Sequence, residues 1–306
     1  MLNIRGITKT YGNIKELDDI NLSIKKGEFY GILGPNGAGK TTLMNIIVGF
    51  LESDWGSVEL GGETITSKKL KIRNKIGYVP QEISVYLELT AEQNLKIFGK
   101  LFNIPAKELK KRSEEVLELV QLSERRNDAV KTYSGGMKRR LNLAVSLLHH
   151  PELILCDEPT VGVDPQSRNA IFDMLQKINS NGTTIIYTTH YMEEAERLCS
   201  KIAIMDNGKV ISEGTLFELI ANLNQKETIK VRKTSESSDI VKTLSGFGKV
   251  IEQDFVYELS LDEKYELNSD LLRQLEEKNI PLTRLEITGA SLEDVFLTLT
   301  GRSLRD

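Results

Sequence analysis

The sequence predicts an α/β domain followed by a smaller α+β domain, and three observations lead to this fold class. Short apolar runs alternate with amphipathic helical segments as far as about residue 215, a pattern typical of a largely parallel sheet covered by helices. The length of 306 residues suits two domains of roughly 150 residues each. The composition then shifts near residue 222, because residues 221–306 carry 12 Lys+Arg and 16 Asp+Glu and therefore the whole net charge of −4.

The elements of the first domain follow from its apolar runs. The run 153–156 is apolar without alternation, as expected of a strand that is buried on both faces of a parallel sheet. Asp206-Asn207-Gly208-Lys209 separates two apolar runs and predicts a hairpin. The predicted strands are 29–33, 75–79, 153–157, 184–188, 202–205 and 210–212, and the predicted helices are 40–50 and 166–180.

Residues 82–150 differ from the rest of the first domain, because they contain no convincing strand run. Residues 109–120 form a charged amphipathic pattern, and 139–148 is a second helical stretch. We therefore expect a mostly helical insert, at about 82–150, carried on the α/β core.

The C-terminal 86 residues predict a small βαββαβ unit, of which a ferredoxin-like split βαβ is one form. Its predicted elements are strand 227–232, helix 236–245, strands 248–252 and 255–260, helix 267–278, strand 282–287 and helix 291–299. We expect the two domains to be 1–220 and 221–306.

Composition excludes several classes of protein. Hydrophobic residues make up 40% and charged residues 27%, which are ordinary values for a soluble globular protein. No apolar run approaches the roughly 18 residues that a membrane span needs, and no secretory signal pattern is present. The two cysteines, Cys156 and Cys199, imply no disulfide framework. The net charge of −4 argues against a basic nucleic-acid binder, so no nucleic-acid partner is expected.

The strongest local signal is a phosphate-binding loop between a predicted strand and a predicted helix. Its glycines let backbone N–H groups turn around phosphate oxygens, Lys40 supplies a positive charge for the β- and γ-phosphates, and the Thr41 hydroxyl can bind Mg²⁺. An ordinary Gly-rich turn is the alternative, but chance gives such a match in only roughly 1% of chains of this length. The loop is Gly34-Pro35-Asn36-Gly37-Ala38-Gly39-Lys40-Thr41, and Thr42 follows it.

A pair of acids, Asp157 and Glu158, ends the apolar run 153–156. An Asp at the carboxyl end of a buried strand lies where ligands bind in doubly wound sheets. We expect Asp157 to hold Mg²⁺ through water and Glu158 to orient or deprotonate the attacking water. Helix capping is the alternative role for such acids, and the phosphate loop in the same chain favours catalysis.

Tyr133-Ser134-Gly135-Gly136-Met137 resembles the signature loop of ATP-binding-cassette (ABC) ATPases, which usually reads Leu-Ser-Gly-Gly-Gln. By the same resemblance, Tyr11 stacks on adenine, Gln81 is the Q-loop residue, Asp164 belongs to the D-loop and His190 is the switch histidine. The resemblance covers about residues 1–220. It implies an ABC-type P-loop domain with a mixed sheet and a helical insert.

The resemblance also implies which residues act on ATP. Taken singly, Tyr11 is an ordinary surface aromatic, Ser134-Gly135-Gly136 a flexible loop and His190 a structural hydrogen-bonding residue; only their joint order overrides these alternatives. The implied catalytic residues are Lys40, Glu158 and His190, and the implied Mg²⁺ ligands are Thr41, Gln81 and, through water, Asp157. ATP-binding residues are Tyr11, Gly34, Pro35, Asn36, Gly37, Ala38, Gly39, Lys40, Thr41, Thr42 and Gln81, and Ser134, Gly135 and Gly136 act on the ATP of a partner subunit.

Three segments resemble exporter ATPases of the drug, antibiotic, sodium and polysaccharide type: 133–140, 87–95 and 291–301. This resemblance implies a subunit that couples ATP-driven dimer closure to a conformational change in a separate polytopic membrane permease. The expected partners are that permease and a second nucleotide-binding domain, as a homodimer. The expected location is cytoplasmic and peripheral, on the inner face of the cell membrane. An importer subunit, or a soluble ABC ATPase acting on the ribosome or DNA, is the alternative.

The segment after Gln81 is rich in apolar residues for a loop region. Ile83, Val85, Tyr86, Leu87 and Leu89 could receive a short helix of a membrane subunit. Internal packing of the helical insert explains the same residues equally well, and the sequence does not separate the two interpretations.

Overall fold

The computed structural model describes residues 1–221, 223, 228–233, 240–262, 265, 267–278, 280–289 and 291–301, without the side chains of Leu70, Thr228 and Thr288. Contacts divide the chain into two compact units, Met1–Leu216 and Phe217–Leu304. The division falls a few residues before the boundary expected from composition, and the domain limits 1–220 and 221–306 stay a prediction.

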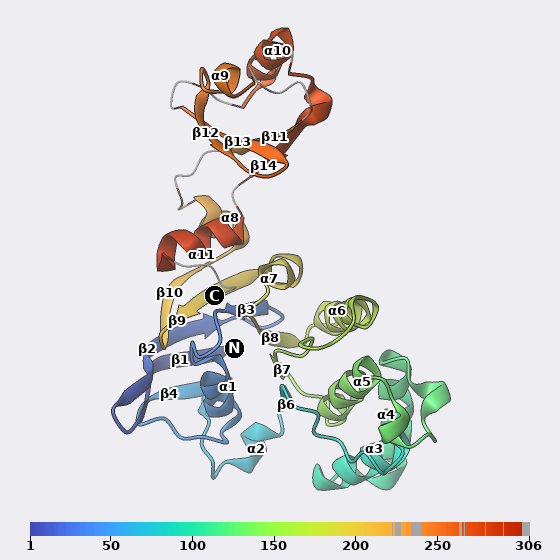
Figure 1. Cartoon of the computed structure of the whole chain (residues 1–306). Helices are drawn as coiled ribbons and strands as arrows, with labels where there is room; N and C mark the ends of the chain where they lie inside the picture. The colour runs from blue at the N-terminus through green and yellow to red at the C-terminus, as the bar shows by residue number, and fades with distance from the viewer. Residues whose placement is uncertain are drawn as a thin grey trace. The chain divides into compact units, whose positions relative to one another are not determined.

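A six-stranded sheet lies at the centre of the first unit, in the order β10-β9-β3-β8-β7-β6 (Figure 1). β3 pairs in parallel with β8 and β9, β7 pairs in parallel with β8 and β6, and only β10 is antiparallel. The mixed sheet is therefore confirmed. Its strands are β3 (Phe29–Leu33), β6 (Ile76–Val79), β7 (Leu153–Asp157), β8 (Thr184–Thr189), β9 (Lys201–Asp206) and β10 (Lys209–Gly214).

Helices cover both faces of this sheet, because its central strands are apolar on both sides. Leu153 and Leu155 of β7 face one core with α1, whereas Ile154 and Cys156 face the other with α5 and α6. This alternation explains why the run 153–156 shows no polar face. The helices of the α/β core are α1 (Lys40–Val48), α2 (Leu70–Arg73), α6 (Pro165–Ser180) and α7 (Met192–Leu198).

The sequence did not predict the antiparallel sheet β2-β1-β4-β5 that packs on α1. Register shifts interrupt the β1–β2 ladder, and Gly6 in β1 has a positive φ, so the apolar alternation is irregular. Buried residues of this sheet, such as Ile7 and Leu17, share one core with Leu43 and Ile47 of α1. Its strands are β1 (Leu2–Tyr11), β2 (Ile14–Ile24), β4 (Trp55–Leu60) and β5 (Glu63–Thr64).

The insert at 82–150 is helical, as predicted. Thr90 begins α3 (Ala91–Leu101) with a capping box to Gln93, and Ser134 caps α5 (Gly135–Leu147). α5 starts before the predicted residue 139 because this cap precedes the apolar periodicity. The remaining elements are α4 (Ala106–Leu119) and 3₁₀ turns at Ser123–Arg125 and Val130–Thr132.

The second unit contains an antiparallel sheet in the order β12-β13-β11-β14, with β13 inserted between β11 and β12 as in a split βαβ. The predicted strand 282–287 is partly wrong, because residues 282–284 form a 3₁₀ turn. Residues 227 and 236–239 of two predicted elements lie outside the described residues. The elements are α8 (Leu216–Ala221), β11 (Thr228–Arg232), α9 (Ile240–Leu244), β12 (Gly248–Glu252), β13 (Val256–Leu261), α10 (Ser269–Glu277), β14 (Leu285–Thr288) and α11 (Leu292–Thr300).

Among the helices of the described residues, none combines the length and the apolar character that crossing a membrane requires.

Candidate active site

A polar cavity of about 310 Å³ lies beside the loop between β3 and α1. It joins four segments that are far apart in the sequence: β2, the phosphate loop with the start of α1, Gln81 two residues after β6, and Glu158 directly after β7. The cavity therefore gathers eight of the predicted site residues of the first domain. Its lining residues are Glu16, Asn36, Gly37, Gly39, Lys40, Thr41, Thr42, Gln81 and Glu158.

The phosphate loop has the backbone that an anion site requires. Gly39 caps α1 in the left-handed region, with φ +92°, and no side chain occupies the amides of the first helical turn. That turn carries no acidic residue, so the positive end of the helix is free to face an anion. A Cβ on Gly34 would lie 2.3 Å from the Met205 carbonyl oxygen, so the loop accepts only glycine there.

Lys40 and Glu158 form a buried ion pair at the base of the cavity, with 5% and 6% of their side chains exposed. Lys40 Nζ lies 3.1 Å from Glu158 Oε1 and donates hydrogen bonds to the carbonyls of Gly34 (2.7 Å) and Pro35 (3.0 Å). The ammonium is thus held at the mouth of the phosphate loop. A buried ammonium next to free helix amides provides positive potential for a polyphosphate.

Three side chains converge on the carboxylate of Glu158. Besides Lys40, Gln81 Nε2 donates a 3.4 Å hydrogen bond to Oε2, and His190 Nδ1 lies 3.2 Å from the same oxygen. Despite this short distance, His190 Nδ1 makes no hydrogen bond of acceptable geometry to any of the described residues. Glu158 has a φ of +44°, a conformation that costs a non-glycine residue about 1–3 kcal/mol and clusters at functional sites. The structure therefore brings together three of the residues singled out in the sequence, Gln81, Glu158 and His190.

Asp157, at the end of β7, is fully buried next to the cavity. Thr188 donates a 2.7 Å hydrogen bond to Oδ1, and the Tyr78 hydroxyl lies 3.4 Å from Oδ2. Burial raises the pKa of Asp157, and hydrogen bonds from Thr188 and Thr41 oppose that rise in pKa. The predicted metal-binding oxygens of Thr41 and Asp157 are therefore neighbours, and oxygen donors of this kind suit Mg²⁺.

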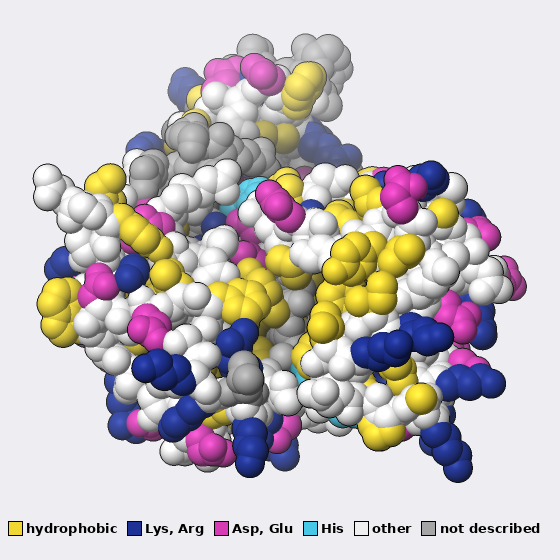
Figure 2. All heavy atoms as spheres, turned by 90° about the horizontal axis from the view of Figure 1, so that it is seen from below, with side chains coloured by type: hydrophobic (Ala, Val, Ile, Leu, Met, Phe, Trp, Pro, Cys, Tyr) yellow, Lys and Arg dark blue, Asp and Glu magenta, His cyan; other side chains and the backbone are white. Residues whose placement is uncertain are grey.

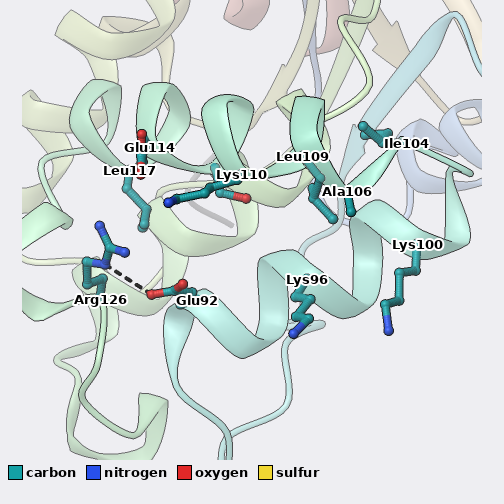
Figure 3. Close-up of a pocket in the computed structure, with 11 residues that line it drawn as sticks. Glu92, Lys96, Lys100, Ile104, Ala106, Leu109, Lys110, Glu114, Leu117 and Arg126 are labelled. Atoms are coloured by element: carbon teal, nitrogen blue, oxygen red, sulfur yellow. Dashed lines mark hydrogen bonds and ion pairs between the residues drawn. The ribbon is translucent and has the colours of Figure 1, made fainter.

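A second cavity, of about 390 Å³, lies between α3 and α4 (Figure 3). Leu109 and Leu117 line it, and Arg126 pairs with Glu92 at 3.0 Å. Lys96 and Lys100 also line it, and in Figure 3 their side chains extend away from α4. None of the predicted site residues lines it, so the candidate site is the polar cavity at the phosphate loop.

Comparisons with known proteins agree with this geometry. A family profile described as ABC transporter matches residues 17–161. The chain is 41% identical, over the whole of both chains, to the linearmycin resistance ATP-binding protein LnrL of Bacillus subtilis. It is 37% identical to the Nod factor export ATP-binding protein I of Ralstonia nicotianae, with 100% of this chain and 95% of the relative covered. The chain belongs to the ABC transporter family.

Solved ABC structures resemble the first unit. A dimeric ATP-binding cassette in a post-hydrolysis state, bound to ADP and Pi, matches with a TM-score of 0.64 and 32% identity, over 70% of this chain and 98% of that chain. The ADP conformation of an ABC transporter cassette matches with a TM-score of 0.66 and 30% identity, over 73% and 94%. This chain is therefore an ABC-type ATPase that binds and hydrolyses ATP.

Tyr11, the signature loop and the D-loop are predicted ABC elements that lie outside the cavity lining. Tyr11 is half-exposed at the end of the β1–β2 hairpin, with the Lys9 ammonium 5.6 Å from the centre of its ring. Ser134 is exposed and accepts a hydrogen bond from the Met137 amide at the start of α5. Asp164 caps α6, where the Ser167 amide holds the pKa of its carboxyl below the usual range. The structure does not bring these residues to the cavity of their own chain.

Sequence reasoning missed several residues of the site. Glu16 lines the cavity and accepts a 3.3 Å hydrogen bond from Thr42, although no pattern around it in β2 signals a site. The Thr188 hydroxyl donates a hydrogen bond to the Asp157 carboxylate. The same hydroxyl accepts a hydrogen bond from the Glu158 amide at 3.0 Å. A polar residue at the carboxyl end of an otherwise apolar strand was the available signal for Thr188.

Proposed function

We propose that this ATPase subunit of an ABC exporter works as a dimer of two copies and passes ATP-driven closure to a separate polytopic permease. The single observation that carries the ATPase part is the convergence of Lys40, Gln81 and His190 on Glu158 beside the phosphate loop. Relatives named for linearmycin resistance and Nod factor export align over the whole chain. These relatives favour export over import or action on the ribosome or DNA.

In the proposed site, each residue has a role that its position supports. Lys40 and the α1 amides bind the β- and γ-phosphates, and Glu158 accepts a proton from the attacking water while His190 orients that water. Thr41, Gln81 and Asp157 would hold Mg²⁺, Asp157 through water. The ion would neutralise charge on the phosphates. Tyr11 would stack on the adenine from the hairpin that also supplies Glu16.

A dimer follows from the position of the signature loop. Ser134 and Gly135 are exposed, and neither lines the cavity of its own chain. The Ser134 hydroxyl and the α5 amides can donate hydrogen bonds to a γ-phosphate. Supplied by a second copy, these donors would complete the site of the first copy. Similarity to cassettes solved as dimers supports this arrangement. Closure would then depend on the γ-phosphate that both copies contact.

A groove of about 400 Å³ between the α/β core and the helical insert is the proposed permease-docking site. Figure 2 shows hydrophobic side chains on both sides of a hollow near the centre of the face that it draws. Among the apolar residues of 83–89, Ile83 and Val85 pack inside the helical insert, while Tyr86 and Leu87 are exposed. The groove is lined by Val48, Phe50, Arg73, Asn74, Ile76, Tyr78, Pro80, Ser84, Phe98, Phe102, Asn142, Val145, Ser146 and His149.

A short apolar helix of the permease fits this groove, because aromatic side chains line it and one wall, Phe50, is 60% exposed. Docking there would hold the subunit on the cytoplasmic face of the cell membrane.

The test is purification of the tagged chain from its host in mild detergent, read by mass spectrometry. We expect a polytopic membrane protein with the wild type, and its loss with Phe50→Glu while ATP hydrolysis continues. Phe255→Glu changes another exposed phenylalanine, in the second unit; it is the matched control and keeps the partner. Ribosomal or DNA-bound proteins in place of a membrane protein would refute the transport role.

A further inference from the structure

Glu194 on α7 is a carboxylate that the proposed mechanism does not use, and only 3% of the residue is exposed. It accepts three hydrogen bonds from hydroxyl groups. Thr160 Oγ1 donates to Oε1 at 2.8 Å, and Tyr187 OH and Thr189 Oγ1 donate to Oε2 at 2.9 and 2.8 Å. The nearest cationic group is Arg168, whose Nε lies 3.7 Å from Oε1.

The partners of Glu194 belong to the two segments that flank the catalytic carboxylate. Thr160 lies two residues after Glu158, at the start of the loop that leads to Asp164. Thr189 directly precedes His190, and its hydroxyl also accepts a 2.9 Å hydrogen bond from the Tyr191 amide. The carboxylate of Glu194 is therefore bonded to Thr160 on the D-loop side and to the Thr189 hydroxyl, which in turn accepts from the backbone amide on the other side of His190.

Burying the Glu194 carboxylate raises the free energy of the folded protein unless all of its hydrogen bonds are present. A buried carboxylate without partners carries a large desolvation penalty, whereas charge-assisted hydrogen bonds offset it. Thr160 Oγ1 and Tyr187 OH also lie 3.2 Å apart, but with both hydroxyl hydrogens donated to Glu194 they make no hydrogen bond to each other. Burial and the Glu194 charge raise the pKa of Tyr187 well above its usual value, so its hydroxyl remains a donor. A shift of either segment alone would break bonds to the buried charge.

We propose that Glu194 is a positioning residue for hydrolysis, which locks the His190 segment to the start of the D-loop so that the two segments move together. Through this lock, contact of the D-loop with a second copy would be transmitted to the histidine beside Glu158. The inference rests on the proposed roles of His190, Asp164 and the dimer. A purely structural role, anchoring α7, is the alternative that the experiment has to separate.

The test is Glu194→Gln in the full chain, which places an amide N–H₂ against hydroxyl donors. We expect this variant to lower kcat for ATP hydrolysis by roughly 10- to 100-fold, because one charge-assisted hydrogen bond is lost. We expect KM for ATP and binding of a fluorescent ATP analogue to stay at the wild-type value, because no residue of the cavity lining is changed. Glu193→Gln is the matched control, an exposed neighbour on the same helix, and keeps the wild-type kcat.

Two further variants keep the inference testable if Glu194→Gln folds poorly. Thr189→Val removes one donor at nearly constant volume and should lower kcat, whereas Thr189→Ser keeps the hydroxyl and should restore it. Where Glu194→Gln folds, its effect and that of Thr189→Val should not add, because both act on one network. Wild-type kcat in Thr189→Val, or equal losses in the Val and Ser variants, would overturn the inference, as would a rise in KM that accounts for the whole effect.

Failure of the proposed function would look different. Glu158→Gln would then hydrolyse ATP at the wild-type rate. Failure of the present inference leaves hydrolysis and its dependence on Glu158 intact, and only the Glu194 and Thr189 variants lose their expected effect.

Discussion

At the scale of single residues, Glu158 is where the cavity's charges meet. Its carboxylate faces an ammonium, an amide and an imidazole, and its backbone adopts a positive φ that the surroundings maintain. The Thr188 hydroxyl links its amide to the Asp157 carboxylate, because it accepts from one and donates to the other. A carboxylate contacted by three side chains, on a backbone held by Thr188, needs little reorganisation when a water molecule presents its proton.

Glu158→Gln should bind ATP and hydrolyse it roughly 10²- to 10⁴-fold more slowly, because an amide cannot accept the proton. Phosphate release measures the rate, and light scattering should show a dimer trapped by ATP. Glu152→Gln is the control, since Glu152 is exposed just before the same strand. Unchanged hydrolysis in Glu158→Gln would disprove the role of this residue.

Lys40→Ala should abolish ATP binding and also destabilise the nucleotide-free protein. The substitution leaves the Glu158 carboxylate buried without its cation. This should lower the free energy of unfolding by about 1–3 kcal/mol, because one side of the ion pair faces a cavity that is open to water. Urea unfolding should show that loss, and the double variant Lys40→Ala/Glu158→Gln should regain part of it. Equal stability of the single and double variants would mean that the ion pair contributes nothing.

At the scale of elements, the site depends on how closely α5 approaches the sheet. α5 carries the signature loop at its start, and a Cβ on Gly77 of β6 would lie 2.4 Å from the Ser146 carbonyl oxygen of α5. Asn142 of α5 also bonds the segment after Gln81, because it donates to the Glu82 carbonyl and accepts from the Ser84 amide, both at 3.1 Å. One helix therefore joins the signature loop to the Q-loop side of the cavity.

Gly77→Ala should lower the free energy of unfolding by about 1–3 kcal/mol, because helix backbone has to move away from the new methyl group. Thermal unfolding measures the change. Gly289→Ala serves as the control, since a Cβ there meets no atom within 4 Å and the residue has no positive φ. A Tm for Gly77→Ala equal to that of the control would show that the helix backbone is not held against β6.

At the scale of the whole molecule, the two units have separate cores and only the first contains the nucleotide cavity. The residues that line the cavity come from segments between Glu16 and Glu158. Bound ATP therefore contacts groups of the first unit within one chain.

ATP with Mg²⁺ at a hundred times its Kd should stabilise the first unit by about 2.7 kcal/mol. At about 2–4 °C per kcal/mol, its Tm should rise by roughly 5–11 °C. Hydrogen exchange read by mass spectrometry should show the added protection in Met1–Leu216 and little in the second unit. The Lys40→Ala variant should lose this added protection. Equal protection in both units would show that they unfold together.

Features of this protein that depend on near neighbours in the chain could be predicted from the amino-acid sequence. The phosphate loop and the two acids at the end of β7 are each written in consecutive residues, because loop geometry is local. Their order along the chain was also enough to indicate the ABC family. The irregular β1–β2 ladder was missed, because bulges disturb the alternation that marks a strand.

Only the tertiary structure decided which distant groups meet. Glu16 reaches Thr42, Glu194 reaches Thr160 and Thr189, and the groove draws its walls from α1, α3 and α5. No regular spacing in the sequence relates Glu16 or Glu194 to its partners. Parallel strands connected through helices bring together residues that are far apart in the chain. Buried polar groups must find partners wherever the fold places them, and that requirement acts through space rather than along the chain.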